Sequence, residues 1–510
     1  MADTISLTGF GIADPIPAVR VEVNFAKGEG STATGPRSVL LLGLKSAAGI
    51  GTVDTLYGPD TADQLIDTTT ADALFGAGSE LARMYARFIR ANPWTPCYAI
   101  ATTPGDTPIA ATGTVVLTGP ATANGSIRYS ISKSQFVEVG FITGESITTI
   151  GDRLEDAVNA KADWPFTASN AAGTITMTAK CAGTRGNQIR HMAKVSPLTG
   201  TGIAVTPVSS TAFTGGTVVD DLQNALDLVN ARRFSYIVIA HEDPSNITAA
   251  ATHVATQALP INARRQRLIA ASIDTLAAVL AIASAQNFTR EELIWHEEND
   301  QGTGVLAAQM AAIYTLGESQ SPIQCNYDGW PATEGQRAGW FVEDPMSSEF
   351  ATYSEQIAAL NGGVTPIGRS DTGSAYLVRR ITTKHLVGAA PNYSARDGHK
   401  VSVPDIYADD LQNKLVTLYP QKVLQDDPPQ DAPPPRTTQV VFVGNIRTST
   451  NGLTEAYGPI GGLSLIEKVD QTIAETVVER SVNTSRVNIA VPLRVVDCLH
   501  QVAARVDQVS

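Results

Sequence analysis

The sequence is poor in cysteine, and this shortage excludes two classes of small stabilised domain. Only four cysteines occur among 510 residues, far apart and without a Cys-x-x-Cys pair. Neither a dense disulfide framework nor a zinc ribbon fits this spacing. We expect four buried or partly buried free thiols in a reducing compartment, at Cys97, Cys181, Cys325 and Cys498.

Basic clusters are also scarce. Charged residues make up 17% of the chain, and the formal net charge is −13. Proteins that bind nucleic acid normally carry a dense basic face. The densest basic run, Arg264-Arg265-Gln266-Arg267, borders an apolar strand, so we interpret it as the solvated start of that strand. Nucleic acid is therefore not expected as a partner.

Long apolar runs are missing as well. The most apolar stretch, 268–285, contains Ser272 and Asp274, and it divides into a strand followed by a helix that Asp274 can cap. The first five residues, Met-Ala-Asp-Thr-Ile, lack the basic and apolar regions of a secretory signal. We expect a protein that is made in the cytoplasm and does not insert into a membrane.

Motifs for cofactors and catalysis are not found. Gly9-Phe10-Gly11 does not stand between a strand and a helix, as a dinucleotide-binding loop would. His241-Glu242 begins like the zinc motif His-Glu-x-x-His, but Ser245 occupies the place of the second histidine. The sequence therefore predicts no catalytic residue, no metal and no cofactor.

One acidic loop leaves two interpretations open. His296-Glu297-Glu298-Asn299-Asp300 follows an apolar strand, and α/β enzymes hold their sites at the carboxyl ends of such strands. Glu297, Glu298 and Asp300 could bind a hard cation or serve as acid and base. We favour a solvated loop, with Asp300 near the next helix N-terminus, because no partner nucleophile or base is marked elsewhere.

What the sequence does contain is a regular alternation of strands and helices. Apolar strands at 236–240, 267–271 and 292–295 alternate with helices at 218–229, 248–259, 275–285 and 305–316. This pattern predicts an α/β fold whose core is a doubly wound, mainly parallel sheet. A chain of this length exceeds one simple core, so further domains are expected.

Flanking regions differ from this core in composition. The stretch 105–215 is rich in Thr, Gly, Ser and Ala and predicts an inserted β-rich domain. We expect an N-terminal arm (1–30), the first part of the α/β core (31–104), the inserted β-rich domain (105–215), the remainder of the subtilisin-like α/β core (216–375), a C-terminal α+β domain (376–495) and a C-terminal extension (496–510).

Both chain ends predict extended arms. Val19, Val21 and Val23 alternate with polar residues, which is the periodicity of a strand. At the other end, 503–509 fits either a strand or a helix, and Val502, Val506 and Val509 are the arm residues expected there. A lone strand cannot satisfy its own backbone hydrogen bonds. We therefore expect both arms to pair with the sheets of neighbouring copies.

Three segments in the last third of the chain carry a further pattern. They are Val378-Arg379-Arg380-Ile381-Thr382-Thr383, the stretch from Ile406-Tyr407-Ala408-Asp409-Asp410-Leu411 to Tyr419-Pro420 and Asp427, and Arg486-Val487-Asn488 with Pro492 and Val496. In order, they resemble the opening strand, the following helix with its exit, and the final strand of the C-terminal domain in the contractile-tail sheath family, Mu-like branch. The N-terminal arm departs from the family's common pattern, since it reads Pro17-Ala18-Val19-Arg20-Val21-Glu22-Val23.

The resemblance implies a structural virion protein. Members of this family form six-subunit rings, stacked helically around a tail tube, and contraction drives the tube through the host envelope. Implied partners are further copies of the chain, the tube protein, and the baseplate and terminator proteins, with assembly in the host cytoplasm. The subtilisin-like label of such cores describes a fold and not an activity.

Alternatives remain open at this point. The chain could be the sheath of a bacterial contractile injection particle, which neighbouring genes or the particle itself would reveal. It could be an α/β hydrolase-like enzyme, which a fluorophosphonate label on a serine would support. A shell protein is a weaker alternative, since it would not predict a strand-forming arm at each end.

Overall fold

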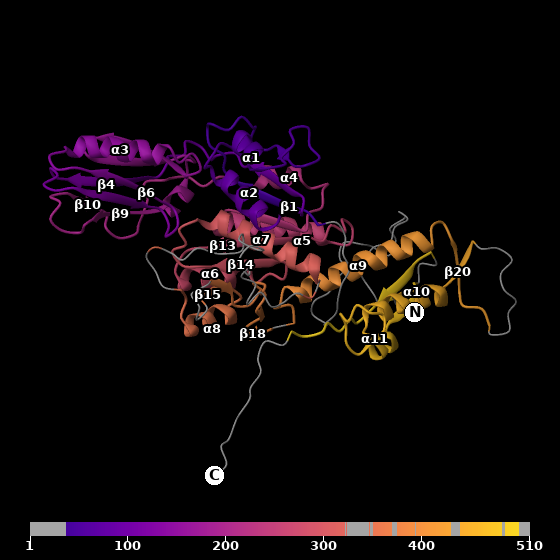
Figure 1. Cartoon of the computed structure of the whole chain (residues 1–510). Helices are drawn as coiled ribbons and strands as arrows, with labels where there is room; N and C mark the ends of the chain where they lie inside the picture. The colour runs from indigo at the N-terminus through magenta and orange to yellow at the C-terminus, as the bar shows by residue number, and fades with distance from the viewer. Residues whose placement is uncertain are drawn as a thin grey trace, which may run out of the picture.

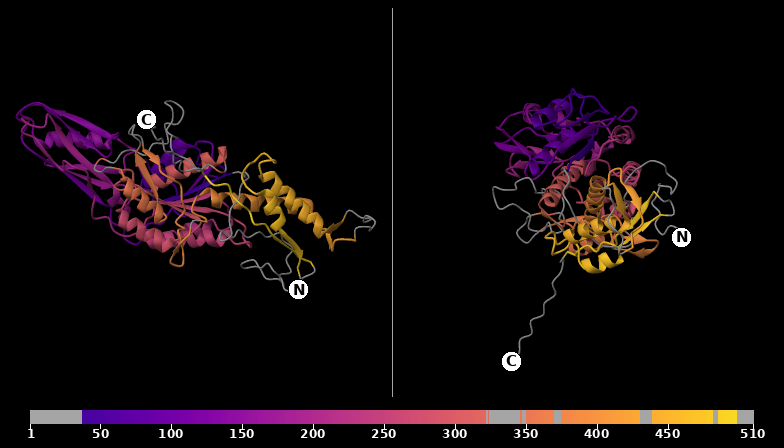
Figure 2. Two further views of the ribbon diagram at one scale, coloured as in Figure 1. Left: turned by 90° about the horizontal axis from the view of Figure 1, so that it is seen from below. Right: turned by 90° about the vertical axis from the view of Figure 1, so that its right-hand side faces the viewer.

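The computed structural model describes residues 37–321, 323, 346, 350–369, 375–392, 394–429, 439–481 and 485–498. Three groups of elements lie in a row: the sheets of 112–212 at one end, the α/β core in the middle and the C-terminal elements at the other end (Figures 1 and 2). All six valines of the expected arms lie outside the described residues.

The core is built on one eight-stranded sheet with the order β16-β15-β14-β13-β12-β1-β3-β2. Its strands are β1 (Val39–Gly43), β2 (Leu56–Tyr57), β3 (Cys97–Ala101), β12 (Tyr236–Ile239), β13 (Arg267–Ser272), β14 (Glu291–Trp295), β15 (Thr365–Arg369) and β16 (Ala375–Leu377). All pairings from β3 to β15 are parallel, and the two edge pairings are antiparallel. The five central strands are buried along their whole length, as parallel strands covered on both faces must be.

Helices cover both faces of this sheet. Alternate strand residues divide accordingly: Leu41 and Val238 join one hydrophobic cluster, and Leu40 and Ile237 join the other. The first face carries α1 (Thr68–Phe75), α2 (Glu80–Ala91) and α7 (Thr303–Gln320), and the second carries α4 (Gln223–Leu228), α5 (Pro244–Ala258), α6 (Leu276–Gln286) and α8 (Tyr353–Asn361). The α/β class predicted from the alternation is therefore confirmed.

Two local predictions for the core are wrong. Helix α4 begins at Gln223 instead of Val218, because Val218 adopts a positive φ of 71° that no α-helix contains. Asp274 does not cap α6; the N-cap is Thr275, without a side-chain cap hydrogen bond, and the Asp274 carbonyl accepts from Trp295 Nε1 at 2.8 Å.

Residues 112–212 form two four-stranded sheets with a hydrophobic cluster of their own. One sheet is β10-β4-β8-β7 and the other is β11-β9-β5-β6, with helix α3 (Ile147–Asn159) packed beside them. The strands are β4 (Thr112–Thr118), β5 (Gly125–Ser130), β6 (Phe136–Phe141), β7 (Phe166–Ala171), β8 (Thr174–Ala179), β9 (Arg190–Ser196), β10 (Ala204–Thr206) and β11 (Thr211–Ala212). Alternation in the sequence predicts four of these strands, at 114–117, 127–131, 137–141 and 174–180, which correspond to β4, β5, β6 and β8. It does not predict β7, β9, β10 and β11, in which polar residues interrupt the apolar pattern.

The C-terminal elements enclose a fourth cluster around helix α9 (His399–Leu418). They include the small pair β17 (Leu386–Val387) and β18 (Ala390–Pro391), the parallel pair β19 (Val423–Gln425) and β20 (Val440–Phe442), helices α10 (Val443–Tyr457) and α11 (Val469–Glu475), and the antiparallel pair β21 (Val477–Arg480) and β22 (Val487–Ala490). The sequence also predicts strands at 473–478 and 376–381. The first is wrong in its first half, which is helical, and the second ends early, since β16 stops at Leu377.

Cysteine chemistry differs from the expectation at one position. Cys97 and Cys181 carry free thiols, and burial raises the pKa of Cys181 to about 12, so its thiolate form is disfavoured. Cys498 is instead disulfide-bonded, so the prediction of four free thiols is wrong there.

Candidate functional site

Charged side chains gather at the amino ends of the central strands. Tyr236 and Arg267 are the first residues of β12 and β13 and lie directly opposite each other. Glu292 of β14 is paired with Ile269 of β13. Ile269 lies two residues after Arg267 on the same strand, so Glu292 projects from the same face of the sheet as Arg267. Glu318 reaches this group from the last turn of α7, which covers that face. We call this set, with Arg37, Arg380 and Ser402, the α9 joint.

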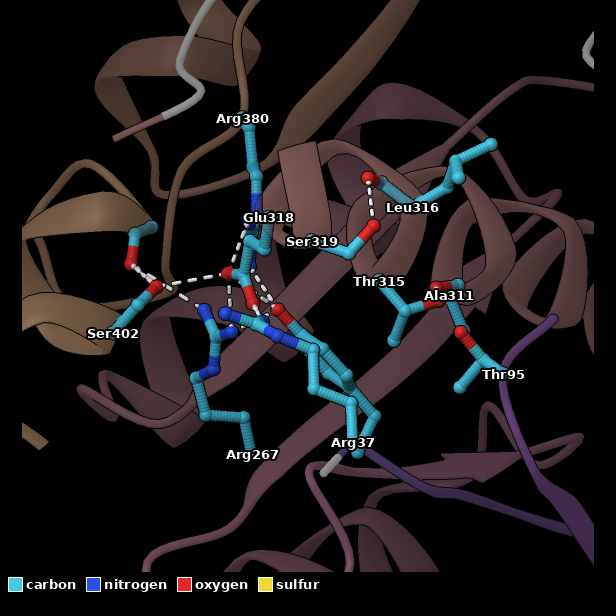
Figure 3. Close-up of polar contacts among 12 residues, drawn as sticks. Arg37, Thr95, Arg267, Ala311, Thr315, Leu316, Glu318, Ser319, Arg380 and Ser402 are labelled. Atoms are coloured by element: carbon cyan, nitrogen blue, oxygen red, sulfur yellow. Dashed lines mark hydrogen bonds and ion pairs between the residues drawn. The ribbon is translucent and has the colours of Figure 1, made fainter. Parts of the chain in front are cut away.

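Glu318 is the centre of the α9 joint. Figure 3 shows Arg37, Arg267 and Arg380 pointing toward Glu318, with Ser402 approaching it from α9. Its Oε1 accepts from Tyr236 Oη at 2.7 Å, from Arg380 Nη1 at 2.8 Å and from Ser402 Oγ at 2.8 Å, and it also contacts Arg267 Nη2. Its Oε2 accepts from Arg37 Nη1. One carboxylate thus binds donors from five separate parts of the chain.

The side chains at the centre of the α9 joint are almost completely buried. The side chains of Glu318, Glu292 and Arg380 are 1%, 0% and 1% exposed. Arg380 forks onto both oxygens of Glu292 at 2.6 and 2.7 Å. Burial lowers the pKa of Arg267, while the charge of Glu292 acts in the opposite direction. Removal of one partner from such a pair leaves an uncompensated buried charge, which costs free energy. The ion pairs therefore favour one arrangement of the segments that contribute them.

Helix α9 presents a polar stripe to the core. Ser402, Asp405 and Asp409 follow the i, i+3, i+7 spacing that places residues on one helix face. Asp405 binds both Nη atoms of Arg290, at 2.5 and 2.7 Å. Asp409 binds Arg265 at 2.6 Å and Arg233 at 2.5 Å. The helix is therefore held to the core by ion pairs.

This arrangement corrects the interpretation of the basic run. Arg265 and Arg267 are 3% and 5% exposed, so they are not solvated residues at the start of a strand. Their charges are instead matched by carboxylates of α9 and α7 that lie more than 50 residues away in the sequence. Only Arg264 of the three arginines is partly exposed.

A second polar contact lies at the opposite, carboxyl edge of the sheet. Arg185, from the inserted sheets, binds Glu80 Oε1 at 2.8 Å and Asp220 Oδ1 at 2.5 Å. His241 Nε2 lies 3.1 Å from the same Asp220 oxygen. Burial alone would raise the pKa of Asp220, but the charge of Arg185 and hydrogen bonds from His241 and Arg185 lower it well below the usual range. We call this group, with Gln188 and Arg190 and their partners, the insert joint.

The acidic loop belongs to the insert joint. Arg190 Nη2 binds Glu298 Oε1 at 2.6 Å, and Asp300 Oδ2 accepts from the Met346 backbone at 2.7 Å. Gln188 donates to Glu242 Oε1 at 2.8 Å and accepts from the backbone of Thr303, the first residue of α7, at 3.1 Å. The solvated-loop interpretation holds only in part: Glu297, Glu298 and Asp300 are partly buried, and Glu298, whose side chain is 35% exposed, binds the inserted sheets, while Asp300 lies just before α7 as expected.

The geometry of this edge is that of a contact between parts of the chain. Side chains from 184–190 occupy the carboxyl edge, where α/β enzymes hold their sites. A cavity of about 50 Å³ beside it, lined by Arg83, Cys181 and Gln301 among others, has room for a few water molecules. In the described part of the chain no group of three His, Cys, Asp or Glu could hold a metal, and no helix is long and apolar enough to span a membrane.

The sequence does not predict the contacts of either joint, although several of the residues, such as Arg267, Arg380 and Glu298, stand in segments considered above. Arg267, Glu292 and Arg380 each stand within or beside apolar strand residues, where a charge must be paired. That burial signal was present in the sequence. The sequence does not show which carboxylate pairs with which arginine, because partners such as Glu318 and Arg37 are 281 positions apart.

Comparison with known proteins gives one curated relative. No family model matches the chain. A Mu-like prophage FluMu tail sheath protein from Haemophilus influenzae is 27% identical over 186 residues, which is 36% of this chain and 37% of that protein. Over this stretch the chain is similar to a Mu-like tail sheath protein. The match spans little more than a third of the length of that relative.

Two solved structures align with most of the chain at low sequence identity and low TM-score. The crystal structure of a sheath tail protein from Desulfitobacterium hafniense covers 90% of this chain and 93% of its own, with 11% identity and a TM-score of 0.44. A chain of the anti-feeding prophage baseplate covers 97% and 99%, with 10% identity and a TM-score of 0.42.

Proposed function

We propose that the protein is a structural subunit of a contractile tail sheath, a component of the virion. Copies would form stacked hexameric rings around a tail tube and contract to drive the tube through the host envelope. The observation that carries the proposal is the 27% identity to a Mu-like tail sheath protein over 186 residues. Its partners would be further copies of itself, the tube protein, and the baseplate and terminator proteins.

Assembly would use the chain ends. The pair β21–β22 consists of only two strands, and isolated two-stranded sheets are marginally stable in water. Strands donated by other copies, carrying Val19, Val21 and Val23 or Val502, Val506 and Val509, would extend such a sheet. Each added backbone hydrogen bond contributes roughly 0.5–1.5 kcal/mol.

A structural role is also supported by the carboxyl edge of the central sheet. Arg185, Gln188 and Arg190 occupy the region in which an α/β enzyme would bind its substrate. We therefore propose that the protein has no catalytic site, and that the polar residues of both joints serve to connect parts of the chain.

The domain division is proposed on the same basis. The separate hydrophobic clusters of 111–213 and 407–478 support an inserted domain at 105–215 and a C-terminal domain at 376–495. The arm at 1–30, the two parts of the α/β core at 31–104 and 216–375, and the extension at 496–510 complete the proposal. Helices on both faces of the central sheet support a doubly wound core.

Negative-stain electron microscopy of the purified full-length protein tests this function. We expect long hollow cylinders with regular striations. A protein that stays monomeric at high concentration and labels with a fluorophosphonate on a serine would overturn the proposal in favour of a hydrolase. Neighbouring genes for a head and a portal would separate a phage tail from an injection particle.

A further inference from the structure

The α9 joint connects the beginning of the described chain with its C-terminal elements. Arg37 is the first residue that the structure describes, and it directly precedes β1 of the central sheet. Its guanidinium binds Oε2 of Glu318 and its side chain is 12% exposed. Ser402 of α9 binds Oε1 of the same carboxylate. The root of the N-terminal segment and the first turns of α9 therefore share a single buried acid.

The carboxylate of Glu318 has no free acceptor position for a further hydrogen bond. A carboxylate offers about four lone-pair positions, and here five groups donate to it: Arg37, Arg267, Arg380, Tyr236 and Ser402. If one donor leaves, the carboxylate rotates toward those that remain, and the geometry at the others changes. The interactions of this set are thus expected to be non-additive.

We propose that Glu318 is a positioning residue that couples the root of the N-terminal segment to the orientation of α9. A displacement of Arg37 alters the Glu318 carboxylate, which alters its hold on Ser402 and on the first turns of α9. Because α9 leads into the elements that carry β21 and β22, the contact between Arg37 and Glu318 also affects the position of that strand pair. In a sheath this would make the two inter-subunit arms interdependent, a consequence that rests on the proposed function.

The test uses hydrogen exchange on the full-length protein kept unassembled at low concentration. We expect Arg37→Gln to accelerate exchange of the backbone amides of 402–411 roughly tenfold, the ratio that corresponds to one hydrogen bond to a charged group. In a Glu318→Gln background, the same Arg37→Gln change should add less than twofold, because the mediator is already gone. Arg153→Gln removes a more exposed ion pair, with Glu145 in the inserted domain, and should leave 402–411 unchanged.

Unchanged exchange at 402–411 in Arg37→Gln would overturn the coupling, as would full additivity in the double variant. If Glu318→Gln does not fold, Ser402→Ala takes its place: the Arg37→Gln effect should then shrink, and an undiminished effect would count against the proposal. None of these measurements needs cylinders. A failure of assembly would therefore reject the sheath function and leave the coupling result intact, and the reverse also holds.

Discussion

At the scale of single residues, Glu291 is a buried acid without an ion pair in the described part of the chain, although both of its neighbours in the sequence have one. Arg290 and Glu292, on either side of it, are held in ion pairs, whereas both carboxylate oxygens of Glu291 are buried without a hydrogen-bond partner. Burial raises the pKa of Glu291 from 4.5 to about 8. At neutral pH this side chain is therefore mostly a neutral carboxylic acid inside the fold.

The raised pKa predicts a stability that falls as the pH rises. A group whose pKa is higher in the folded than in the unfolded chain contributes stability below its unfolded value, and that contribution is lost as the pH rises through the folded value. For Glu291 the window runs from about pH 4.5 to about pH 8. We expect Glu291→Gln to be more stable than the wild type at pH 8, by on the order of 4 kcal/mol, and its stability to lack this decline with pH.

Urea unfolding followed by circular dichroism at pH 5, 6.5 and 8 measures the effect. Glu455→Gln, an exposed change on α10, is the matched control and should keep the wild-type slope. Identical slopes for Glu291→Gln and the wild type would mean that the carboxyl of Glu291 finds water or a cation in solution.

At the scale of elements, the ion pairs of α9 give a second prediction. Asp405→Asn leaves the buried guanidinium of Arg290 without its bidentate carboxylate. Loss of one partner from a buried pair costs about 3–5 kcal/mol, and we expect that loss in the free energy of unfolding. The first half of α9 should also exchange its amides faster. Asp470→Asn, on the exposed side of α11, serves as control, and equal stability of the two variants would contradict the prediction.

The same scale shows what the sequence could predict. The apolar run 38–43 predicts β1, and the three runs between helices predict β12, β13 and β14, each to within about one residue, because a buried apolar run has few alternatives. The inserted strands were predicted only where alternation was regular, as in β4 and β6. The site was predicted least well. Burial of Arg267 depends on partners from distant segments, and periodicity within a short window carries no information about them.

At the scale of the whole molecule, the inserted sheets can be removed as a unit. Replacing 105–215 by a short Gly/Ser bridge deletes Arg185, which leaves Glu80 and Asp220 at the carboxyl edge without their shared cation. We expect a folded core, visible by circular dichroism, with a stability lowered by roughly 2–4 kcal/mol. Adding Asp220→Asn should recover part of the loss. If the shortened chain is unfolded both with and without this change, the inserted sheets are required for the core to form.

The chain ends give the last prediction. Deletion of 1–24 removes Val19, Val21 and Val23 and leaves every described element in place. We expect a protein with the circular dichroism spectrum of the full chain that no longer forms cylinders in the electron microscope. Val21→Pro should act in the same direction, because it removes one backbone donor from a pairing strand. Cylinders of normal length from the deleted chain would show that assembly does not depend on this arm.

Helix α7 gives the molecule a mechanical property. Its first residue, Thr303, contacts Gln188 of the insert joint, and Glu318 in its last turn holds the α9 joint. Its 18 residues span about 27 Å, and its backbone hydrogen bonds run along its axis. We expect α7 to transmit a force applied along this axis between the insert joint and the α9 joint. Under such a force, the polar contacts at the two ends of the helix should break before the helix itself does.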